Sequence, residues 1–577
     1  MHDILIKNGT IIDGTGREGF RGDIAIGEGR ITAVGDAGEA ASRETIDAAG
    51  KIVAPGFIDL HSHADFVMPL ADHDRVLKPL VMQGVTTFIG GNCGFSAAYV
   101  PAKNRGLVSA HLENLSGRPM GDIITWRTPA EYFDTVRAKG MLLNMGMLAG
   151  HGTLRIASSG LETRLLFPDE MKEMERLLEE SLEMGCLGLS TGLQYFPGSM
   201  SDTDELVRMG SVLKKYGGIF TSHLRSYSHT LDLAMEEVFE VGRQNGVRLQ
   251  ISHLYWQPYS RGMAAVTRQA VRLGSFAYNR LKLPIPVEKG LVPKIRTIEK
   301  RRREGIDVHF DMVPTSQGFT ELFAFLPPYV SEGSRAQALE RLADRAFRKR
   351  VLHDIDHVEP DWPHRDGATW SFNYLKMTGW DGLRVMAVPT EGNRWMEGKT
   401  FPEIARETGG EAFDAICDLL IEENGQVLVF HTPTVPDDPF VFRSMWAGFT
   451  HPLSMPATDA ILRPVGRPAH VFYDCFPRFI QAFALDRKML SMEEVVRKIT
   501  SLPADIMGLE GRGRLSKGCH ADVVVFDPIR LRSGADFYNP EVHPEGIEHV
   551  IVNGRAVVRS GVRVEGVLAG DVVRRGA

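Results

Sequence analysis

The chain has 577 residues, of which 43% are hydrophobic and 24% are charged, and its formal net charge is −7. This length suits one large domain with an accessory domain, and the mildly acidic charge excludes an obvious nucleic-acid surface. The five cysteines are odd in number and widely spaced, which argues against a disulfide framework and fits a reducing compartment. The polar N-terminus does not resemble a signal peptide, and no apolar run reaches the roughly 20 residues of a membrane span. We expect a cytoplasmic protein without a nucleic-acid or membrane partner, and homo-oligomer formation stays open.

Both ends of the chain are rich in short strands and tight turns. Alternating apolar residues such as Ile4 and Ile6 are followed by Asn-Gly and Asp-Gly pairs, and Asn553-Gly554 repeats the pattern near the C-terminus. Such dipeptides between alternating segments are typical of β-hairpins. We predict that residues 1–55 and 510–577 join into one small β-sandwich or barrel domain, with residues 56–509 folded separately.

The middle of the chain alternates apolar runs with amphipathic helical segments. Eight runs are candidate strands, at 56–63, 85–94, 142–151, 186–193, 218–225, 247–254, 306–314 and 451–460. This alternation predicts an α/β fold with a parallel sheet and, at this number of strands, a (β/α)8 barrel of the TIM type. The run GQVLVF at 426–431 exceeds the eight and is not placed. The segment near 256–300 interrupts the alternation, and it fits either an insertion over the barrel mouth or a surface excursion.

Residues that commonly bind metals stand at the ends of five predicted strands. The first strand ends in His61 and His63, whose alternation points both side chains to one face. The others contribute one residue each: Cys93, His223, His253 and Asp459. In a barrel the carboxyl ends of the strands surround a single site. One such residue alone would be read as structural, but together they predict a metal centre.

The types of these residues indicate the metal and its chemistry. Imidazole, thiolate and carboxylate ligands together favour zinc over magnesium or calcium. Six ligands exceed one tetrahedral site, so we expect either two ions that share a ligand, for which Cys93 is the sulfur candidate, or one tight and one weak site. Zinc lowers the pKa of a bound water to about 7 and polarises a carbonyl. Asp459 is then the expected general base that becomes the acid, which describes hydrolysis of an amide or related acyl bond.

Several motifs resemble those of a known family. PGFIDLHSHAD (55–65), His223, His253 and Asp459 resemble the amidohydrolase superfamily. VTTFIGGNCGFS (85–96), GHGTLR (150–155), LSTGLQYFPG (189–198) and FPRFI (476–480) are similar to its N-acyl-D-amino-acid deacylase, or D-aminoacylase, branch. The resemblance covers nearly the whole chain apart from 256–300. It implies the barrel with a β-domain, zinc bound by Cys93, His223 and His253, and a second, weaker site made by His61, His63, Cys93 and Asp459.

The departures from the family pattern fall on substrate recognition. D-aminoacylases usually carry a lysine two residues after the second strand-end histidine, where this chain has Tyr255. They usually end the next strand in Asp-x-Tyr-Pro-Tyr, where this chain has DMVPT with Thr315 last, and they carry an arginine near the place of Val471. In the family these side chains hold the carboxylate of the D-amino acid. A buried carboxylate without charged partners is costly, so we infer a substrate that lacks it, unless an arginine approaches from another direction; the candidates are Arg155, Arg225, Arg463 and Arg467.

Further substrate contacts are expected near the same strand ends. The candidates, besides Tyr255 and Thr315, are His151, Ser190, Tyr195 and Arg225. The leading hypothesis is a zinc hydrolase of a linear amide, such as an N-acyl amide, acting on a small molecule. The alternatives are a hydrolase of a cyclic amide, carbamate, ester or lactone, and a metal-binding regulatory protein that has lost catalysis. Retention of Asp459 speaks against the last of these, because a pure binder needs no base.

Overall fold

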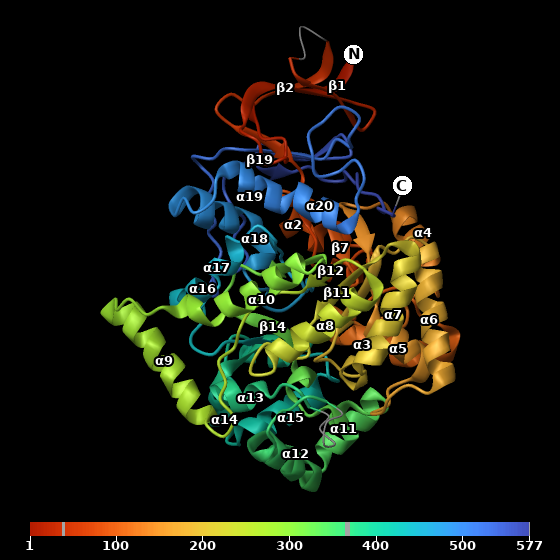
Figure 1. Cartoon of the computed structure of the whole chain (residues 1–577), viewed down its shortest axis with the longest axis vertical. Coiled ribbons are helices and arrows are strands. Elements are labelled where there is room, and N and C mark those ends of the chain that lie inside the picture. Colours follow the sequence, from red (N-terminus) through yellow and green to blue (C-terminus); the bar gives the residue numbers. More distant parts are fainter. Residues whose placement is uncertain (37–40, 364–369, 576–577) are drawn as a thin grey trace.

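The computed structural model describes residues 1–36, 41–363 and 370–575, and a barrel of parallel strands lies at its centre (Figure 1). One sheet pairs three strands in the order β6-β7-β8, and a 6-stranded sheet has the order β17-β13-β12-β11-β10-β9. The strands are β6 Phe57–Asp59, β7 Val85–Gly90, β8 Asn144–Met147, β9 Ala149–Gly150, β10 Gly188–Gly192, β11 Ile219–His223, β12 Leu249–Ile251, β13 Val308–Met312 and β17 Ser454–Pro456.

The two sheets join at both edges. The amide of Leu187, just before β10, donates to the carbonyl of Met147 in β8 over 2.8 Å. The amide of Asp459, just after β17, donates to the carbonyl of His61 over 2.9 Å. All eight apolar runs predicted as strands contain a barrel strand, with β8 and β9 sharing one run. The predicted (β/α)8 barrel is therefore confirmed.

Helices between the strands cover the outside of the barrel. Neighbouring helices α6 (Pro168–Glu183), α7 (Thr203–Tyr216) and α8 (Leu231–Asn245) bury their apolar faces against it (Figure 1). The carboxylate of Asp202 caps α7 by accepting from the amide of Glu205 over 2.9 Å, and α7 and α8 both end at a glycine in the left-handed conformation.

Strands from the two ends of the chain form a 9-stranded sheet above the barrel (Figure 1). The N-terminal strands are β1 His2–Ile11, β2 Phe20–Gly27, β3 Arg30–Gly35, β4 Ser42–Asp47 and β5 Ile52–Pro55. The C-terminal strands are β18 Val523–Phe526, β19 Ile547–Val552, β20 Arg555–Arg559 and β21 Val562–Arg563. Antiparallel pairing of β18 with β5 joins the two halves. The small β-domain made by both termini is thus confirmed as part of the fold.

Besides the segment near 256–300, a second inserted unit lies between β13 and β17, and the sequence did not predict it. Its 3-stranded sheet has the order β14-β16-β15, with bounds Gly318–Glu321, Leu428–His431 and Leu383–Ala387. The helices packed around it include α11 Arg335–Ala343, α12 Arg345–His357, α13 Tyr374–Thr378, α14 Phe401–Thr408 and α15 Ala412–Glu422. The unit has its own hydrophobic core. The run GQVLVF, unplaced in the sequence, supplies its central strand β16.

The segment after β12 consists of an arm, residues 256–291, followed by a barrel helix. The arm helix α9 (Ala264–Leu281) projects from the body at the lower left of Figure 1, and a short 3-10 turn, η4 (Val287–Gly290), follows it. Helix α10 (Val292–Arg303) then packs against β13. The end of the segment near 256–300 is therefore a barrel helix. Across the described residues, no helix combines the length and apolar character needed to cross a bilayer.

Candidate metal centre and active site

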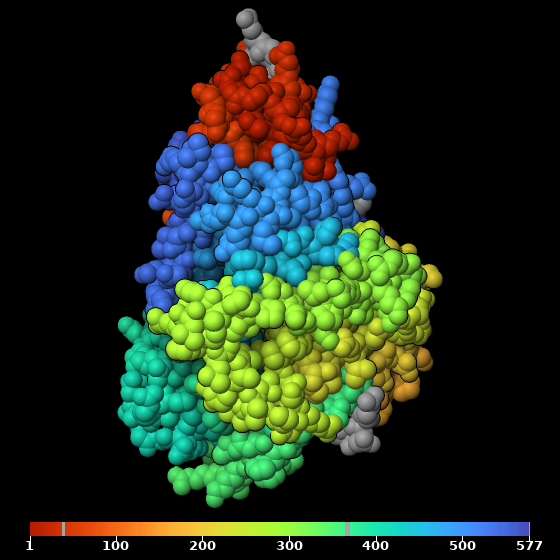
Figure 2. Space-filling view, turned by 60° about the vertical axis from the view of Figure 1, so that its left-hand side comes forward, coloured from red at the N-terminus to blue at the C-terminus, as the bar shows by residue number. Residues whose placement is uncertain are grey.

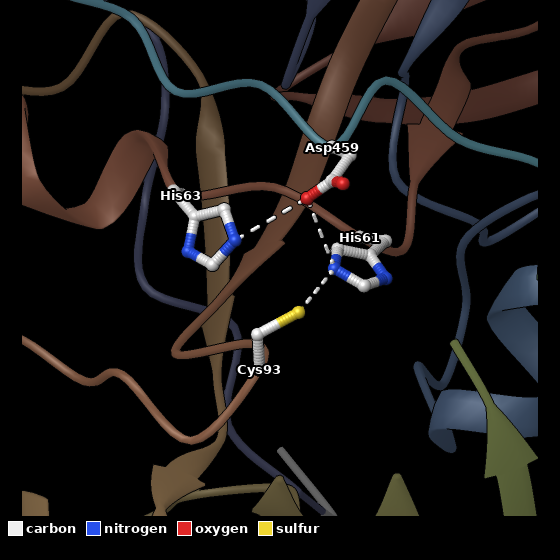
Figure 3. Close-up of side chains that lie close together, drawn as sticks. All are labelled: His61, His63, Cys93 and Asp459. Carbon is white, nitrogen blue, oxygen red and sulfur yellow. Dashed lines mark hydrogen bonds and ion pairs between the residues drawn. The ribbon is translucent and has the colours of Figure 1, made fainter. Parts of the chain in front are cut away.

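The first group of possible metal ligands lies where the barrel closes (Figure 3). His61, His63, Cys93 and Asp459 each offer one ligand atom, and these atoms all lie within 4.8 Å of one another. Asp459 Oδ1 lies 3.2 Å from His61 Nε2 and 3.3 Å from His63 Nε2, and Cys93 Sγ lies 3.2 Å from His61 Nε2. Four ligand atoms from three strand ends thus converge on one point.

A second group shares Cys93 with the first. Cys93 Sγ lies 3.6 Å from His253 Nε2, and His253 Nε2 lies 2.9 Å from His223 Nδ1. The ligand atoms of these three residues again lie within 4.8 Å of one another. Sulfur with two imidazole nitrogens is a donor set that suits zinc with an open fourth position, and a thiolate common to two groups can bridge two ions. The residues present therefore fit the expected metal.

The backbone at three of these residues adopts an unusual conformation. Cys93 has φ of 52°, His253 of 35° and Asp459 of 52°, which is the left-handed region that non-glycine residues rarely adopt. Such conformations cost of order 1–3 kcal/mol each and persist only where the surroundings enforce them. At Gly91, with φ of 75°, an added Cβ would lie 2.1 Å from the carbonyl oxygen of Leu148, so only glycine permits this turn before Cys93.

Two side chains that the sequence analysis did not name as site residues orient the histidines. Asp311, at the end of β13, lies with Oδ2 3.2 Å from His61 Nδ1 and accepts from the amide of His253 over 2.6 Å. Gln194 Oε1 lies 2.8 Å from His223 Nε2. Partners of this kind fix which ring nitrogen is free to bind a metal. Asp311 could have been found from its place at the end of a strand, where it matches the aspartate of the family's Asp-x-Tyr-Pro-Tyr motif.

Electrostatics keep the acidic members of the site charged. Burial alone would raise the pKa of the Cys93 thiol, but the charge of His61 and hydrogen bonds with His223 and His253 lower it well below its usual value. Burial likewise opposes ionisation of Asp459, yet His61 and His63 lower the pKa of this carboxyl. Both are therefore held in the anionic form that metal binding requires.

A pocket of about 630 Å³ opens beside this centre. It reaches His223, His253 and Asp459, and most of its wall is apolar or aromatic. Its large apolar and aromatic lining residues include Trp256, Ile285, Phe319, Phe325, Phe372, Phe440 and Met445. Three of the expected substrate contacts, Tyr195, Tyr255 and Thr315, also line it. The pocket can hold a bulky, largely apolar molecule against the metal centre.

The other expected contacts lie outside this pocket. His151 is fully buried, with Nε2 2.8 Å from Glu205 Oε1. The hydroxyl of Ser190 donates to the carbonyl of Gly91 and accepts from the amide of Gly94 over 3.0 Å, so it supports the loop that carries Cys93. Arg225 is fully buried with Glu237. We assign these three residues to the framework of the site.

The other three arginines considered as partners of a substrate carboxylate form hydrogen bonds elsewhere in the protein. Arg155 binds Glu205 and the carbonyl of Pro197. Arg463 donates to the carbonyls of Leu115 and Gln426, and Arg467 donates to that of Phe537. Among the described residues that line the pocket there is no arginine; its cations are Lys289, which is exposed, and Lys294, which pairs with Asp232 over 2.6 Å.

Because Arg225 belongs to the framework, we expect its removal to lower the stability of the fold. The variant Arg225→Ala leaves Glu237 buried and unpaired, so the free energy of unfolding should fall by about 3–5 kcal/mol. Urea unfolding measures this. Arg243→Ala, on the exposed side of α8, the helix that carries Glu237, is the matched control and should cost less than about 1 kcal/mol. A raised KM with unchanged stability in Arg225→Ala would instead show that Arg225 binds the substrate.

Comparisons with known proteins agree with this geometry. An amidohydrolase family model matches residues 44–210 and 450–558. An N-acyl-D-glutamate deacylase of Alcaligenes xylosoxydans xylosoxydans is 30% identical over 562 residues, covering 96% of this chain and 93% of that protein. A D-aminoacylase of the same organism is 29% identical over 555 residues, covering 96% and 94%.

A solved structure extends the likeness to three dimensions. The N-acyl-D-glutamate deacylase of Bordetella bronchiseptica, complexed with zinc and a phosphonate inhibitor, aligns with a TM-score of 0.72 at 26% identity over 99% of each chain. The matches span the barrel and the terminal β-domain alike. The chain therefore belongs to the amidohydrolase family, within its D-aminoacylase branch of metal-dependent hydrolases that act on non-peptide C–N bonds.

Proposed function

We propose that this protein is a zinc-dependent hydrolase of N-acyl amides whose substrate carries no free α-carboxylate. The observation that carries the proposal is the pocket beside Asp459 and His253, whose wall is apolar and aromatic and contains no arginine among the described residues. Amide hydrolysis follows from the branch to which the chain belongs. The neutral character of the substrate follows from what stands at the positions where the family carries its carboxylate anchors.

Each of those positions is filled by an uncharged side chain. Tyr255 stacks on Tyr227, with ring centroids 4.6 Å apart. Thr315 Oγ1 lies 3.2 Å from His470 Nε2, and Val471 is fully buried in the core. A carboxylate in this pocket would lose its water without gaining a charged partner, which costs several kcal/mol. Lys289 is exposed and offers little compensation.

The six strand-end residues divide the work of the site. We assign Cys93, His223 and His253 to the tight zinc site, and His61, His63, Cys93 and Asp459 to the weaker one. When bound, zinc supplies Lewis acidity that activates water and polarises the substrate carbonyl. Asp311 holds His61 through Nδ1, which leaves Nε2 directed toward Cys93 and Asp459.

Proton transfer is the part of the reaction that Asp459 performs. Its carboxylate, held ionised by His61 and His63, accepts the proton of the attacking water and later donates it to the leaving nitrogen. Tyr195 lies beside His223, with ring centroids 4.6 Å apart, and its hydroxyl accepts from Thr320 over 3.0 Å. The Tyr195 proton is thus free to donate to a substrate oxygen, and we propose that it positions the substrate.

A matched pair of substrates tests the proposal. An N-acyl-D-amino acid and its methylamide differ at the carboxylate alone, so kcat/KM should be at least about tenfold higher for the methylamide, with zinc quantified in the same preparation. Efficient turnover of the free acid, at about 10⁴ M⁻¹s⁻¹ or more, would overturn the neutral-substrate assignment. Esters, lactones and hydantoins in the same panel separate the alternative hydrolases, and inactivity on every member would favour the regulatory alternative.

A further inference from the structure

The arm helix α9 presents its apolar side chains to solvent. Val266, Leu273, Phe276 and Leu281 are all more than half exposed, and Leu273 reaches 67%. Their spacing places them along the outer side of the helix, and exposed Leu283 continues the row beyond its end. Surface helices of globular proteins normally show the opposite arrangement, with the polar side outward. In the arm, defined as residues 256–291, this outer row has no protein partner among the described residues.

The inner side of α9 is held to the body by polar contacts. Arg272 donates to both carboxylate oxygens of Asp381, over 2.8 and 2.9 Å. The hydroxyl of Ser275 and the amide of Asn279 both donate to Asp438, each over 2.6 Å. The helix is therefore fixed in this orientation by its own polar residues, and the exposure of its apolar side is a property of the fold.

The charge of this segment is one-sided. The arm contains six lysine or arginine residues and one glutamate, in a chain whose net charge is −7. Two of these cations, Arg261 and Arg272, form ion pairs with Asp361 and Asp381. Arg280 and Lys282, beside Leu281, are exposed and have no ion-pair partner in the described structure. A helix with aromatic and aliphatic residues on one side and cations around them is suited to the interface of an anionic lipid bilayer. Two copies packed through this helix would set like charges against each other.

The arm also forms one wall of the pocket. Trp256, Val271, Ile285 and Val287 line it together with residues of the second inserted unit. Figure 2 brings α9 toward the viewer and shows a hollow bordered by the yellow-green atoms of this part of the chain. The arm thus carries both the apolar outer row and part of the apolar pocket wall.

We propose that α9 docks on an anionic lipid bilayer and that the substrate is an amphiphilic, long-chain N-acyl amide taken from it. The docking surface goes beyond the proposed function, while the substrate class rests on it. A bilayer contact through α9 departs from the expectation of no membrane partner, which rested on the absence of an apolar run long enough to span a membrane. A peripheral contact needs an apolar helix face and cations, and it needs no 20-residue apolar run.

Flotation with vesicles tests the docking surface. The intact protein should bind vesicles of phosphatidylcholine containing phosphatidylglycerol and bind those of phosphatidylcholine alone at least about tenfold more weakly. The double variant Leu273→Glu/Phe276→Glu should lose binding by about tenfold or more. Neither residue lines the pocket, so activity on a water-soluble N-acyl amide should not change. Ile529→Glu is the matched control, since Ile529 is 79% exposed outside the arm, and it should bind as the unaltered protein does.

Two further readouts separate this inference from its alternatives. Hydrolysis of a long-chain N-acyl amide embedded in the vesicles should fall in parallel with binding in the double variant. Absence of binding to either vesicle would overturn the inference, as would a dimer in sedimentation velocity that the double variant dissociates. Vesicle binding through α9 by a protein that hydrolyses no N-acyl amide would refute the proposed function and leave the docking surface standing.

Discussion

Replacing Asp459 by asparagine should lower kcat by about 10²–10⁴ while leaving zinc at the tight site. The effect on rate follows because asparagine keeps the size of the side chain but cannot accept a proton, and general acid-base catalysis contributes that much. The effect on metal follows because the group formed by Cys93, His223 and His253 does not include Asp459. A loss of kcat with unchanged zinc is thus expected of a base and is not expected of a structural residue.

The measurement is kcat on the best soluble N-acyl amide, with zinc determined on the same protein by elemental analysis. Asp307→Asn provides a control for the chemical change itself, because Asp307 lies at the entry to β13 and is half-exposed in an ion pair with Arg248. Its kcat should stay within about twofold of the unaltered enzyme. Full activity of Asp459→Asn would show that the proton passes through another group.

The barrel could be predicted because its strands are short, buried and parallel. Such strands read as continuous apolar runs rather than alternating ones, and here five of the eight runs end in residues with ligand chemistry. His61, Cys93, His223 and Asp459 therefore marked the carboxyl ends of their strands in the sequence itself, and the fold brought them together. Local signals sufficed because a barrel places all such ends on one face.

The second inserted unit could not be predicted on the same basis. Its strand β14 pairs with β16, whose partner residues lie more than 100 positions away, as in the pairing of Gly318 with His431. Nothing in the run GQVLVF distinguishes a strand of a separate antiparallel sheet from a barrel strand. Non-local pairing of this kind depends on the packing of the helices around it, which no short window of sequence contains.

The direction of each side chain was the other property that the sequence could not predict. Arg225 and Ser190 lie close to strand ends, as the ligands do, yet Arg225 turns away to a buried partner and Ser190 supports a loop. Asp311 keeps the aspartate of the family's Asp-x-Tyr-Pro-Tyr motif, but its place in the sequence did not show that its side chain contacts both His61 and His253. Position along a strand predicts that a residue is near the site, and only the packed structure decides which way its side chain faces.

Replacing Cys93 by alanine should remove zinc and lower kcat/KM by at least about 10²-fold. Its sulfur belongs to both groups of candidate ligands, and loss even of a residue that only supports a metal ligand commonly costs 10–100-fold. A merely structural thiol would behave differently, because its removal costs stability and leaves metal content unchanged.

Cys186→Ala is the matched control for the Cys93 variant. Cys186 is as deeply buried, at the entry to β10, but burial raises the pKa of its thiol to about 12, so it remains a neutral core residue. This variant should keep its zinc and its kcat/KM and lose only folding stability. Equal zinc in the two alanine variants, measured after identical purification, would contradict the assignment of Cys93. Zinc loss confined to Cys93→Ala would instead establish that the thiolate at the end of β7 is a ligand, since burial and the removed atom are common to both substitutions.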